Sequence, residues 1–231
     1  MNILTVSHLN KRFGDQRAIV DLSFSIPQGG RVAVFAPSGS GKTTLLQILA
    51  KLQSPDSGSF QVEGPRPTII FQEPRLFPHL TLEENLLLPF QVQGKTLSPQ
   101  TRREYETWLQ VCELGAFRDH FPHQLSGGMK QKAALVRGFL PKPALALLDE
   151  PFQSIGRQAK KEIIRHLLAT NPGLALLLVT HDPEEVQLLA QLTLYFLTNF
   201  LGKYELVENF HDNFRAVSAE KPLRETRRIY E

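Results

Sequence analysis

The sequence has few of the residues that build covalent or metal-based scaffolds, and it has no long apolar run. Cys112 is the single cysteine among 231 residues, which excludes an internal disulfide framework and a zinc cage made of cysteines. No apolar stretch approaches the ~20 residues of a membrane-spanning helix, and the segment Met1–Phe13 lacks the apolar core of a signal peptide. We therefore expect a soluble cytoplasmic chain whose membrane role, if it has one, is exercised through a partner.

The sequence also has only a small excess of positive over negative charge. The formal net charge is +3, and the basic residues are scattered, so charge alone predicts neither nucleic acid nor a membrane surface as a partner. Hydrophobic residues make up 42% of the chain, enough for a sizeable core. At roughly 150 residues per domain, the length allows one large domain or two small ones.

Apolar strands and helical segments alternate along the chain. The first 35 residues read as β-rich, with turns at Gly14-Asp15 and at 27–30. Residues 80–140 read as helical, and strand and helix alternate after residue 140. Near-continuous apolar strands of this kind predict a parallel sheet covered by helices on both faces, an α/β fold. The segment Tyr204–Phe210 is a possible edge strand, and the charged end from Ala219 is expected to be loose.

One helix in the middle region has clear boundaries. Ser98 is a suitable N-cap, Pro99 suits the first helical position, and Gly115 is a plausible C-terminal stop. Because its side chain falls on the apolar face, Cys112 is expected to be a packed core residue rather than a nucleophile. The apolar residues at helical spacing are Tyr105, Trp108, Leu109 and Cys112.

A loop of small residues between an apolar strand and a helix is the strongest local signal. Backbone N–H groups of such a loop can surround phosphate oxygens, and the helix N-terminus adds positive potential. Lys42 can reach the β- and γ-phosphates of a nucleotide, and the Thr43 hydroxyl can ligate Mg²⁺. Ala36 replaces the usual first glycine of such loops, a minor departure. The predicted phosphate-binding residues are Ser38, Gly39, Ser40, Gly41, Lys42, Thr43 and Thr44.

Two carboxylates follow the apolar run at 145–148. Asp149 and Glu150 would lie beyond the carboxyl end of a strand, where open parallel sheets bind ligands. Asp149 can hold Mg²⁺ through water, and Glu150 can polarise an attacking water. A solvated strand end is the alternative reading, which is less plausible for two adjacent acids in a chain with a phosphate loop.

A third motif discriminates between the classes of phosphate-loop protein. Leu125 is followed by Ser126, Gly127 and Gly128 at the start of a helix, shortly before the acidic strand. With the phosphate loop, this order resembles the ATP-binding cassette (ABC) ATPases over roughly residues 1–200. The resemblance implies that the Ser-Gly-Gly signature of one subunit covers the ATP held by another, in a head-to-tail dimer.

The resemblance also implies a fold and roles for further residues. The expected fold is a P-loop NTPase (RecA-like) core with a parallel sheet, an N-terminal antiparallel β-subdomain and an inserted α-helical subdomain. Phe13 would stack on adenine, although a core position is equally expected from the sequence. Gln72 would sense Mg²⁺ and the lytic water, and His181 would contact the γ-phosphate. Glu150, His181, Gln72 and Lys42 thus form the expected catalytic set.

The same resemblance gives domain limits and metal ligands. A single ABC ATPase domain is expected over 1–231, with the nucleotide-binding core and β-subdomain at 1–79 and 141–210, the helical signature subdomain at 80–140 and a charged tail at 211–231. The expected ligands are ATP and Mg²⁺. The metal would be held by Thr43, Gln72 and Asp149.

Two departures from the family pattern stand out. Met129 replaces the glutamine that is frequent in the family signature. The segments 71–81 and 122–129, which include Met129, are similar to those of importers of nitrate, sulfonates and taurine. After the acidic pair, the family usually reads Ser-Ala-Leu-Asp, whereas this chain has Gln153-Ser154-Ile155-Gly156. The missing aspartate normally helps communication across the dimer, so Gly156 puts that coupling in doubt.

The resulting hypothesis is an ATP-hydrolysing subunit of an importer for a small solute. Its expected partners are a second ATP-binding subunit, transmembrane permease subunits and, indirectly, a solute-binding protein, with no nucleic acid. Its expected location is the inner face of the cell membrane, held there by the permease. The alternative is a nucleotide-dependent interaction module with weak hydrolysis. A P-loop kinase is disfavoured by the segment Leu125–Met129 and by the lack of an evident acceptor site. A DNA-repair or chromosome ATPase is disfavoured by the lack of a long heptad segment.

Overall fold

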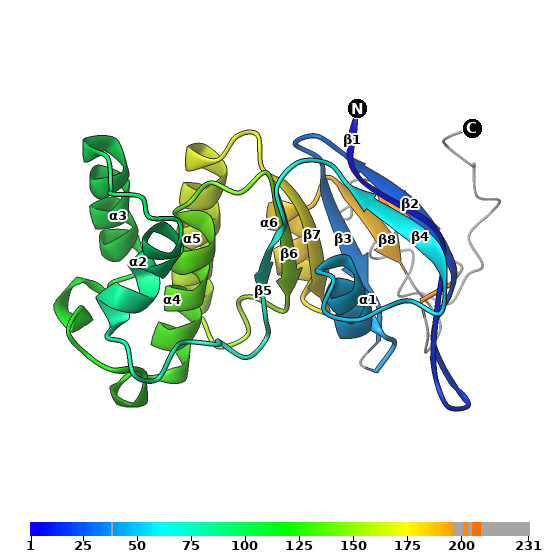
Figure 1. Ribbon diagram of the computed structural model, residues 1–231, viewed down its shortest axis with the longest axis horizontal. Coiled ribbons are helices and arrows are strands. Elements are labelled where there is room, and N and C mark those ends of the chain that lie inside the picture. Colours follow the sequence, from blue (N-terminus) through cyan, green and yellow to red (C-terminus); the bar gives the residue numbers. More distant parts are fainter. Residues whose placement is uncertain (38, 196–200, 203–204, 209–231) are drawn as a thin grey trace. The chain divides into compact units, whose positions relative to one another are not determined.

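The computed structural model describes residues 1–37, 39–195, 201–202 and 205–208 and is drawn in Figure 1. It divides into two compact units. Unit 1 combines Met1–Gly64 with Ala175–Glu231, and unit 2 is Pro65–Leu174. Ser38, Tyr204 and the predicted charged tail lie outside the described residues.

Unit 1 begins with an antiparallel sheet in the order β2-β1-β4. Strand β1 (Asn2–Phe13) pairs with β2 (Gln16–Pro27) and with β4 (Ser57–Val62). Gly14, at φ 57°, forms the turn between the first two strands, because glycine adopts positive φ without steric cost. The β-rich reading of the N-terminal segment and its first turn are thus confirmed.

The second sheet of unit 1 carries the phosphate loop. Strand β3 pairs in parallel with β7 on one side and with β8 on the other, and β9 adds an antiparallel edge to β8. In Figure 1, helix α1 is drawn in front of these strands and α6 behind them, and α6 packs against β7 and β3. Helices therefore cover both faces of a parallel arrangement, as the apolar strands predict. The elements are β3 (Arg31–Phe35), α1 (Lys42–Leu49), β7 (Ala175–Thr180), α6 (Pro183–Leu189), β8 (Leu192–Tyr195) and β9 (Glu205–Glu208).

Unit 2 joins two parallel strands to a group of helices. Strand β5 (Thr68–Ile70) pairs with β6 (Leu145–Asp149), whose residues are all buried. Helix α2 packs on α4, α4 packs on β5, and α3 packs on α5. The helices are α2 (Leu82–Val92), α3 (Pro99–Val111), α4 (Gly127–Phe139) and α5 (Arg157–Thr170), with short 3₁₀ turns at Gly115–Phe117 and Pro122–Gln124. The helical reading of 80–140 is confirmed.

The ends of α3 test the boundary predictions. The Ser98 side chain accepts from the Thr101 N–H at 3.1 Å, and Pro99 is the first helical residue, as predicted. The predicted stop at Gly115 is wrong, because the helix ends at Val111 and Glu113 takes positive φ, at 56°. A non-glycine residue therefore turns the chain. Cys112 is fully buried, which confirms its predicted place in the core.

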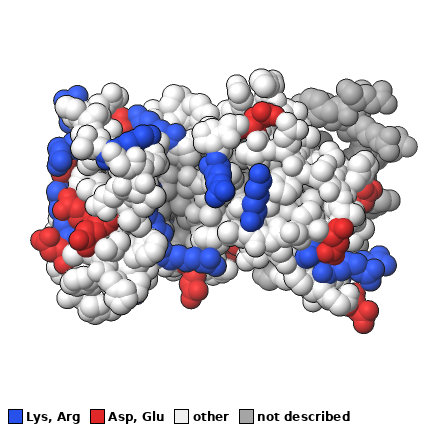
Figure 2. Space-filling view, viewed as in Figure 1, with Lys and Arg blue, Asp and Glu red and all other residues white. Residues whose placement is uncertain are grey.

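The surface of the described residues has a mixed charge. On the face in Figure 2, basic and acidic side chains are interspersed. Across the part of the chain that the structure describes, no helix combines the length and the apolar character needed to cross a bilayer.

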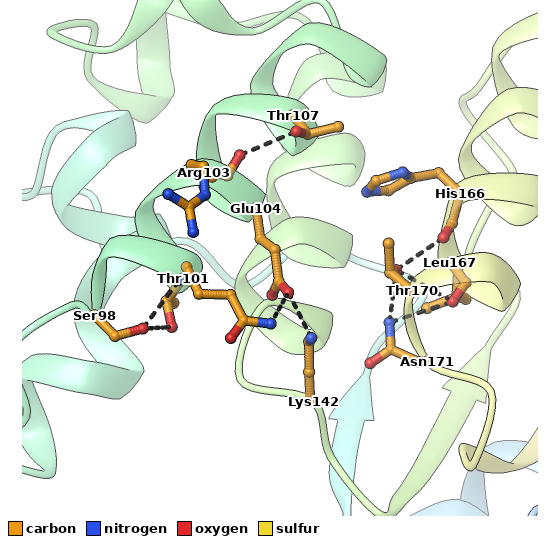
Figure 3. A network of polar contacts seen from close by, with 11 residues as sticks. Ser98, Thr101, Arg103, Glu104, Thr107, Lys142, His166, Leu167, Thr170 and Asn171 are labelled. Carbon is orange, nitrogen blue, oxygen red and sulfur yellow. Dashed lines mark hydrogen bonds and ion pairs between the residues drawn. The ribbon is translucent and has the colours of Figure 1, made fainter.

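The interface between α3 and α5 holds a half-buried histidine. The imidazole of His166 on α5 meets the indole of Trp108 on α3 edge to face, with ring centroids 4.5 Å apart. Figure 3 shows this ring directed toward α3, where Glu104 accepts from Lys142 at 2.6 Å. Among the described residues, the buried Nε2 atom of His166 has no hydrogen-bond partner. Burial lowers the pKa of His166, and the nearby Glu104 carboxylate opposes this only in part.

This histidine gives the interface a predicted pH dependence. Its folded-state pKa is lowered, so the unfolded chain binds more protons, and stability present above the ordinary pKa is lost as pH falls. The free energy of unfolding should therefore decrease from about pH 7 to about pH 5, and His166→Phe should reduce that decrease. Chemical denaturation at both pH values measures this. His79→Phe, at an exposed position, is the control, and an equal effect of both variants would contradict the assignment.

Candidate nucleotide site

The phosphate loop follows β3 and ends at the first turn of α1. Gly39 and Gly41 have φ of 77° and 94°, and a Cβ at Gly41 would lie 2.5 Å from the carbonyl oxygen of Ala18. Glycine is therefore required at position 41 both by conformation and by space. Ala36 is buried and has no positive φ, so the loop does not need a glycine there.

Several features of this loop fit a bound phosphate group. The α1 N-terminus has no side-chain cap and no acidic residue in its first turn, so its N–H groups and its dipole favour an anion. The Ser40 hydroxyl is buried and has no hydrogen-bond partner among the described residues. The Lys42 ammonium donates to the Ala36 and Pro37 carbonyls, both at 2.8 Å. It thus braces the loop and places a positive charge within it.

His181 lies at the same edge of the sheet as this loop. Phe35, the last residue of β3, pairs with Thr180, the last residue of β7, so the segments after both strands leave the sheet together. His181 is exposed. The turn that carries it is fixed by the Asp182 N–H, which donates to the Thr180 hydroxyl at 3.0 Å, and by Glu185, which accepts from that hydroxyl at 2.7 Å.

Phe13 lies at the end of β1 in the same unit. Its side chain is 48% exposed, and the Lys11 ammonium lies 5.5 Å from the ring centroid. The core alternative for this residue is therefore wrong. An exposed ring is available for stacking on a planar ligand.

The acidic pair lies at the carboxyl end of β6 in unit 2. Asp149 is buried, whereas Glu150 is half-buried and has φ of 44°. A residue with a Cβ in this left-handed region carries roughly 1–2 kcal/mol of strain, and such strain is often found at functional sites. The backbone therefore leaves the strand sharply at the residue predicted to act as the base.

Gln72 reaches this acidic pair from the neighbouring strand. Because Ile70 of β5 pairs with Leu148 of β6, the segments after these two strands lie at the same edge. The Gln72 Nε2 lies 3.5 Å from Glu150 Oε2, and it donates to Gln153 Oε1 at 3.0 Å. Three side chains thus form one polar cluster beyond the strands.

The signature residues open helix α4, also in unit 2. The Ser126 hydroxyl caps the helix by accepting from the Met129 N–H at 3.2 Å, and the first turn has no acidic residue. A Cβ at Gly128 would lie 2.7 Å from the Ser154 carbonyl oxygen, whereas the position of Gly127 is open. Gly128 therefore allows the loop after the acidic pair to pack directly on the start of α4.

Two polar residues of this region, Gln131 and Gln153, are not predicted by any motif in the sequence. Gln131, on α4, is buried, and its Nε2 donates to the Pro151 carbonyl at 2.8 Å and lies 3.5 Å from the Phe71 carbonyl. It ties the loop after β6 to the segment before Gln72. In the sequence, Gln153 stands out only as a departure from the family pattern. The signal that could have indicated its role is its position as a polar residue shortly after the acidic pair.

The donor set for a metal ion is small. In the described part of the chain, no group of three or more His, Cys, Asp or Glu side chains could hold a metal by itself. The oxygen donors of Thr43, Gln72 and Asp149 suit Mg²⁺, which binds through one or two carboxylates together with waters and substrate phosphates. The predicted residues fall into two groups, the phosphate loop with His181 and Phe13 in unit 1, and the others in unit 2.

Comparison with known proteins identifies the family of this chain. The sequence profile of the family described as ABC transporter matches residues 19–153. The chain belongs to the ABC transporter family. The α/β fold with parallel and antiparallel sheets is that of its ATPase domains. The chain is similar to a solved dimeric ATP-binding cassette in a post-hydrolysis state bound to ADP and Pi, with 25% identity, a TM-score of 0.76 and coverage of 89% of this chain and 98% of that one.

Curated ABC relatives are longer than this chain. It is 34% identical to a spermidine/putrescine import ATP-binding protein of Nitrosomonas europaea, over 83% of this chain and 56% of the relative. It is 36% identical to a sulfate/thiosulfate import ATP-binding protein of Gloeobacter violaceus, over 80% of this chain and 57% of the relative. The chain thus spans little more than half the length of these relatives.

Unit 2 also has an apolar groove, which Phe71 and Phe77 help to line. A cavity of 410 Å³ lies between β5, α2 and α4. Phe77 and Val92 line it with 52% and 78% of their surface exposed. At its polar side, Arg137 donates to the Arg75 carbonyl at 2.6 Å, and burial lowers the pKa of Arg137. The groove therefore offers exposed apolar side chains and two guanidinium groups.

Proposed function

We propose that this chain is the ATP-binding and ATP-hydrolysing subunit of an ABC importer for a small solute. The observation that carries the proposal is the cluster of Gln72, Glu150 and Gln153, with Gln72 Nε2 3.5 Å from the Glu150 carboxylate. A carboxylate and an amide beyond the strands, in a chain that also has a braced phosphate loop, suit the activation and orientation of a water for attack on phosphorus.

The roles of the chain's own groups follow from their chemistry. Lys42 and the α1 N-terminus bind the β- and γ-phosphates. Glu150 accepts the proton of the attacking water, Gln72 orients that water, and His181 contacts the γ-phosphate. Thr43, Gln72 and Asp149 are the residues that would hold Mg²⁺, which would neutralise charge on the phosphate oxygens when bound. The remaining nucleotide contacts are assigned to Phe13, Ser38, Gly39, Ser40, Gly41, Thr44, Ser126, Gly127 and Gly128.

The proposed partners follow from the presence of two predicted anion sites in one chain, the phosphate loop and the signature at the start of α4. A second ATP-binding subunit would provide the signature for each phosphate loop, consistent with the dimeric state of the similar ATP-binding cassette. The groove lined by Phe77 and Val92 is proposed to receive a permease segment, which would hold the chain on the inner face of the membrane. A solute-binding protein would act through the permease. For the domain limits, we propose a helical signature subdomain at 80–140 and a nucleotide-binding core with the β-subdomain at 1–79 and 141–210.

The solute is proposed at a coarse level only. The relatives import spermidine and putrescine or sulfate and thiosulfate, according to their names. The nitrate, sulfonate and taurine branch remains our finer prediction.

One observation favours a second function, a nucleotide-dependent interaction module with weak hydrolysis. Gly156, in place of the usual aspartate, is the N-cap of α5 and makes no side-chain cap hydrogen bond. Without a carboxylate there, communication between two bound nucleotides would have to use other groups.

Steady-state phosphate release decides between the two functions. The purified chain is assayed with ATP and Mg²⁺, alone and with the permease of a neighbouring gene. The importer subunit should turn over ATP, typically at about 1–10³ per second when coupled. No turnover in either setting would contradict it and favour the interaction module.

A further inference from the structure

The Gln72 side chain has a partner that the family pattern does not provide. Gln153 Oε1 accepts from Gln72 Nε2 at 3.0 Å, across 81 positions of sequence. Both side chains are exposed. The family usually has serine at position 153, and a serine hydroxyl on the same backbone would be too short to reach Gln72. The contact therefore depends on the glutamine of this chain.

The two acceptors near the Gln72 nitrogen determine which way its amide faces. An amide has donors on its nitrogen and acceptor sites on its oxygen. With the nitrogen directed to Gln153 Oε1 and, at 3.5 Å, to Glu150 Oε2, the Gln72 oxygen points away from both. The oxygen is the atom that must face a cation or a water proton. The Glu150 carboxylate, whose oxygens accept, favours this orientation, and Gln153 Oε1 holds the Gln72 amide in it.

The loop that carries Gln153 is itself fastened to the signature helix. Gln131 of α4 donates to the Pro151 carbonyl at 2.8 Å, and Gly128 allows the Ser154 carbonyl to approach closely. Gln153 lies between these two anchored positions. A displacement of the start of α4 would therefore be passed to Gln153 and from there to the Gln72 amide.

We propose that Gln153 is a positioning residue that holds the Gln72 amide beside Glu150 and links it to the signature helix. This inference rests on the proposed ATPase function. It also suggests a compensation for Gly156, because the loop keeps a side-chain connection to the catalytic group although the usual aspartate is missing.

The first test observes the amide directly in the nucleotide-free protein. Gln153→Met keeps the length of the side chain and removes the acceptor. The Gln72 side-chain amide resonance should shift and its protons should exchange faster with water in this variant. Gln153→Glu retains an acceptor and should restore slow exchange. Gln158→Met is the matched control, since Gln158 is an exposed glutamine of α5 that pairs with Glu162. An unchanged Gln72 resonance in Gln153→Met would overturn the proposal.

The second test separates positioning from binding. Gln153→Met should lower kcat by about 2- to 10-fold, the worth of one ordinary hydrogen bond, and leave the nucleotide dissociation constant unchanged. In a Gln72→Ala background the same change should have no further effect, because Gln153 acts through Gln72. An equal loss in both backgrounds would overturn the proposal. Absence of turnover in the wild type would contradict the hydrolytic function instead, and the Gln72 resonance would then decide the role of Gln153 alone.

Discussion

Glu150→Gln is expected to lower ATP hydrolysis by about 10²–10⁴-fold, the usual contribution of a general base, with nucleotide binding intact. Glutamine keeps the shape of the side chain and suits the same backbone, which is important at φ 44°. It lacks the carboxylate that takes the proton from water. Bound ATP should then persist and hold two copies of the chain together.

Phosphate release and the oligomeric state with ATP and Mg²⁺ together measure this result. Glu162→Gln is the matched control, because Glu162 is an exposed glutamate of α5 outside the site. Phosphate release at the wild-type rate would show that Glu150 is not the base. A Glu150→Gln chain that stays strictly monomeric with nucleotide and its membrane subunits would argue against the shared site.

Gly41→Ala is expected to weaken nucleotide binding by about 10- to 100-fold, since a strained backbone position costs of order 1–3 kcal/mol. The φ of 94° is unfavourable for alanine, and its Cβ would lie 2.5 Å from the Ala18 carbonyl oxygen. The loop can accept the methyl group only by moving, which displaces the N–H groups at the start of α1. Titration with a fluorescent ATP analogue measures the loss.

Substitutions at two other glycines distinguish the effect of positive φ from the effect of the contact with Ala18. Gly39 also has positive φ, at 77°, but a Cβ there has no neighbour within 4 Å, so Gly39→Ala should weaken binding less than Gly41→Ala. Gly64→Ala, just after β4 at φ 84° and with no neighbour within 4 Å of an added Cβ, should affect stability and leave nucleotide binding unchanged. Equal binding losses at positions 39 and 41 would contradict the role of the Ala18 contact.

Features that depend on local chemistry could be predicted from the sequence. The phosphate loop, the acidic strand end and the Ser98 cap each need only a short run of residues with defined backbone preferences. The end of α3 could not be predicted in this way. Glu113, and not Gly115, takes the positive φ that turns the chain, and the next residue, Leu114, is buried in the core. Phe13 needed the structure too, since exposure of an aromatic ring depends on distant segments.

The links between motifs were hidden for a different reason. Gln131 and Gln153 act through contacts with residues 20 and 81 positions away, and no periodicity or motif reports such pairs. Side-chain amides are common on protein surfaces, so their presence alone predicts nothing. Only the folded arrangement of β5, β6 and α4 reveals that these two residues join the predicted site.

The burial of Cys112 has a practical consequence for observing subunit closure. Burial raises the pKa of this thiol to about 12, and the side chain is inaccessible, so it will react slowly with maleimides at neutral pH. A cysteine introduced at the exposed position of Gln158 would then be the one reactive thiol. Paired dyes attached there could report the approach of two chains in real time, without removal of a native residue.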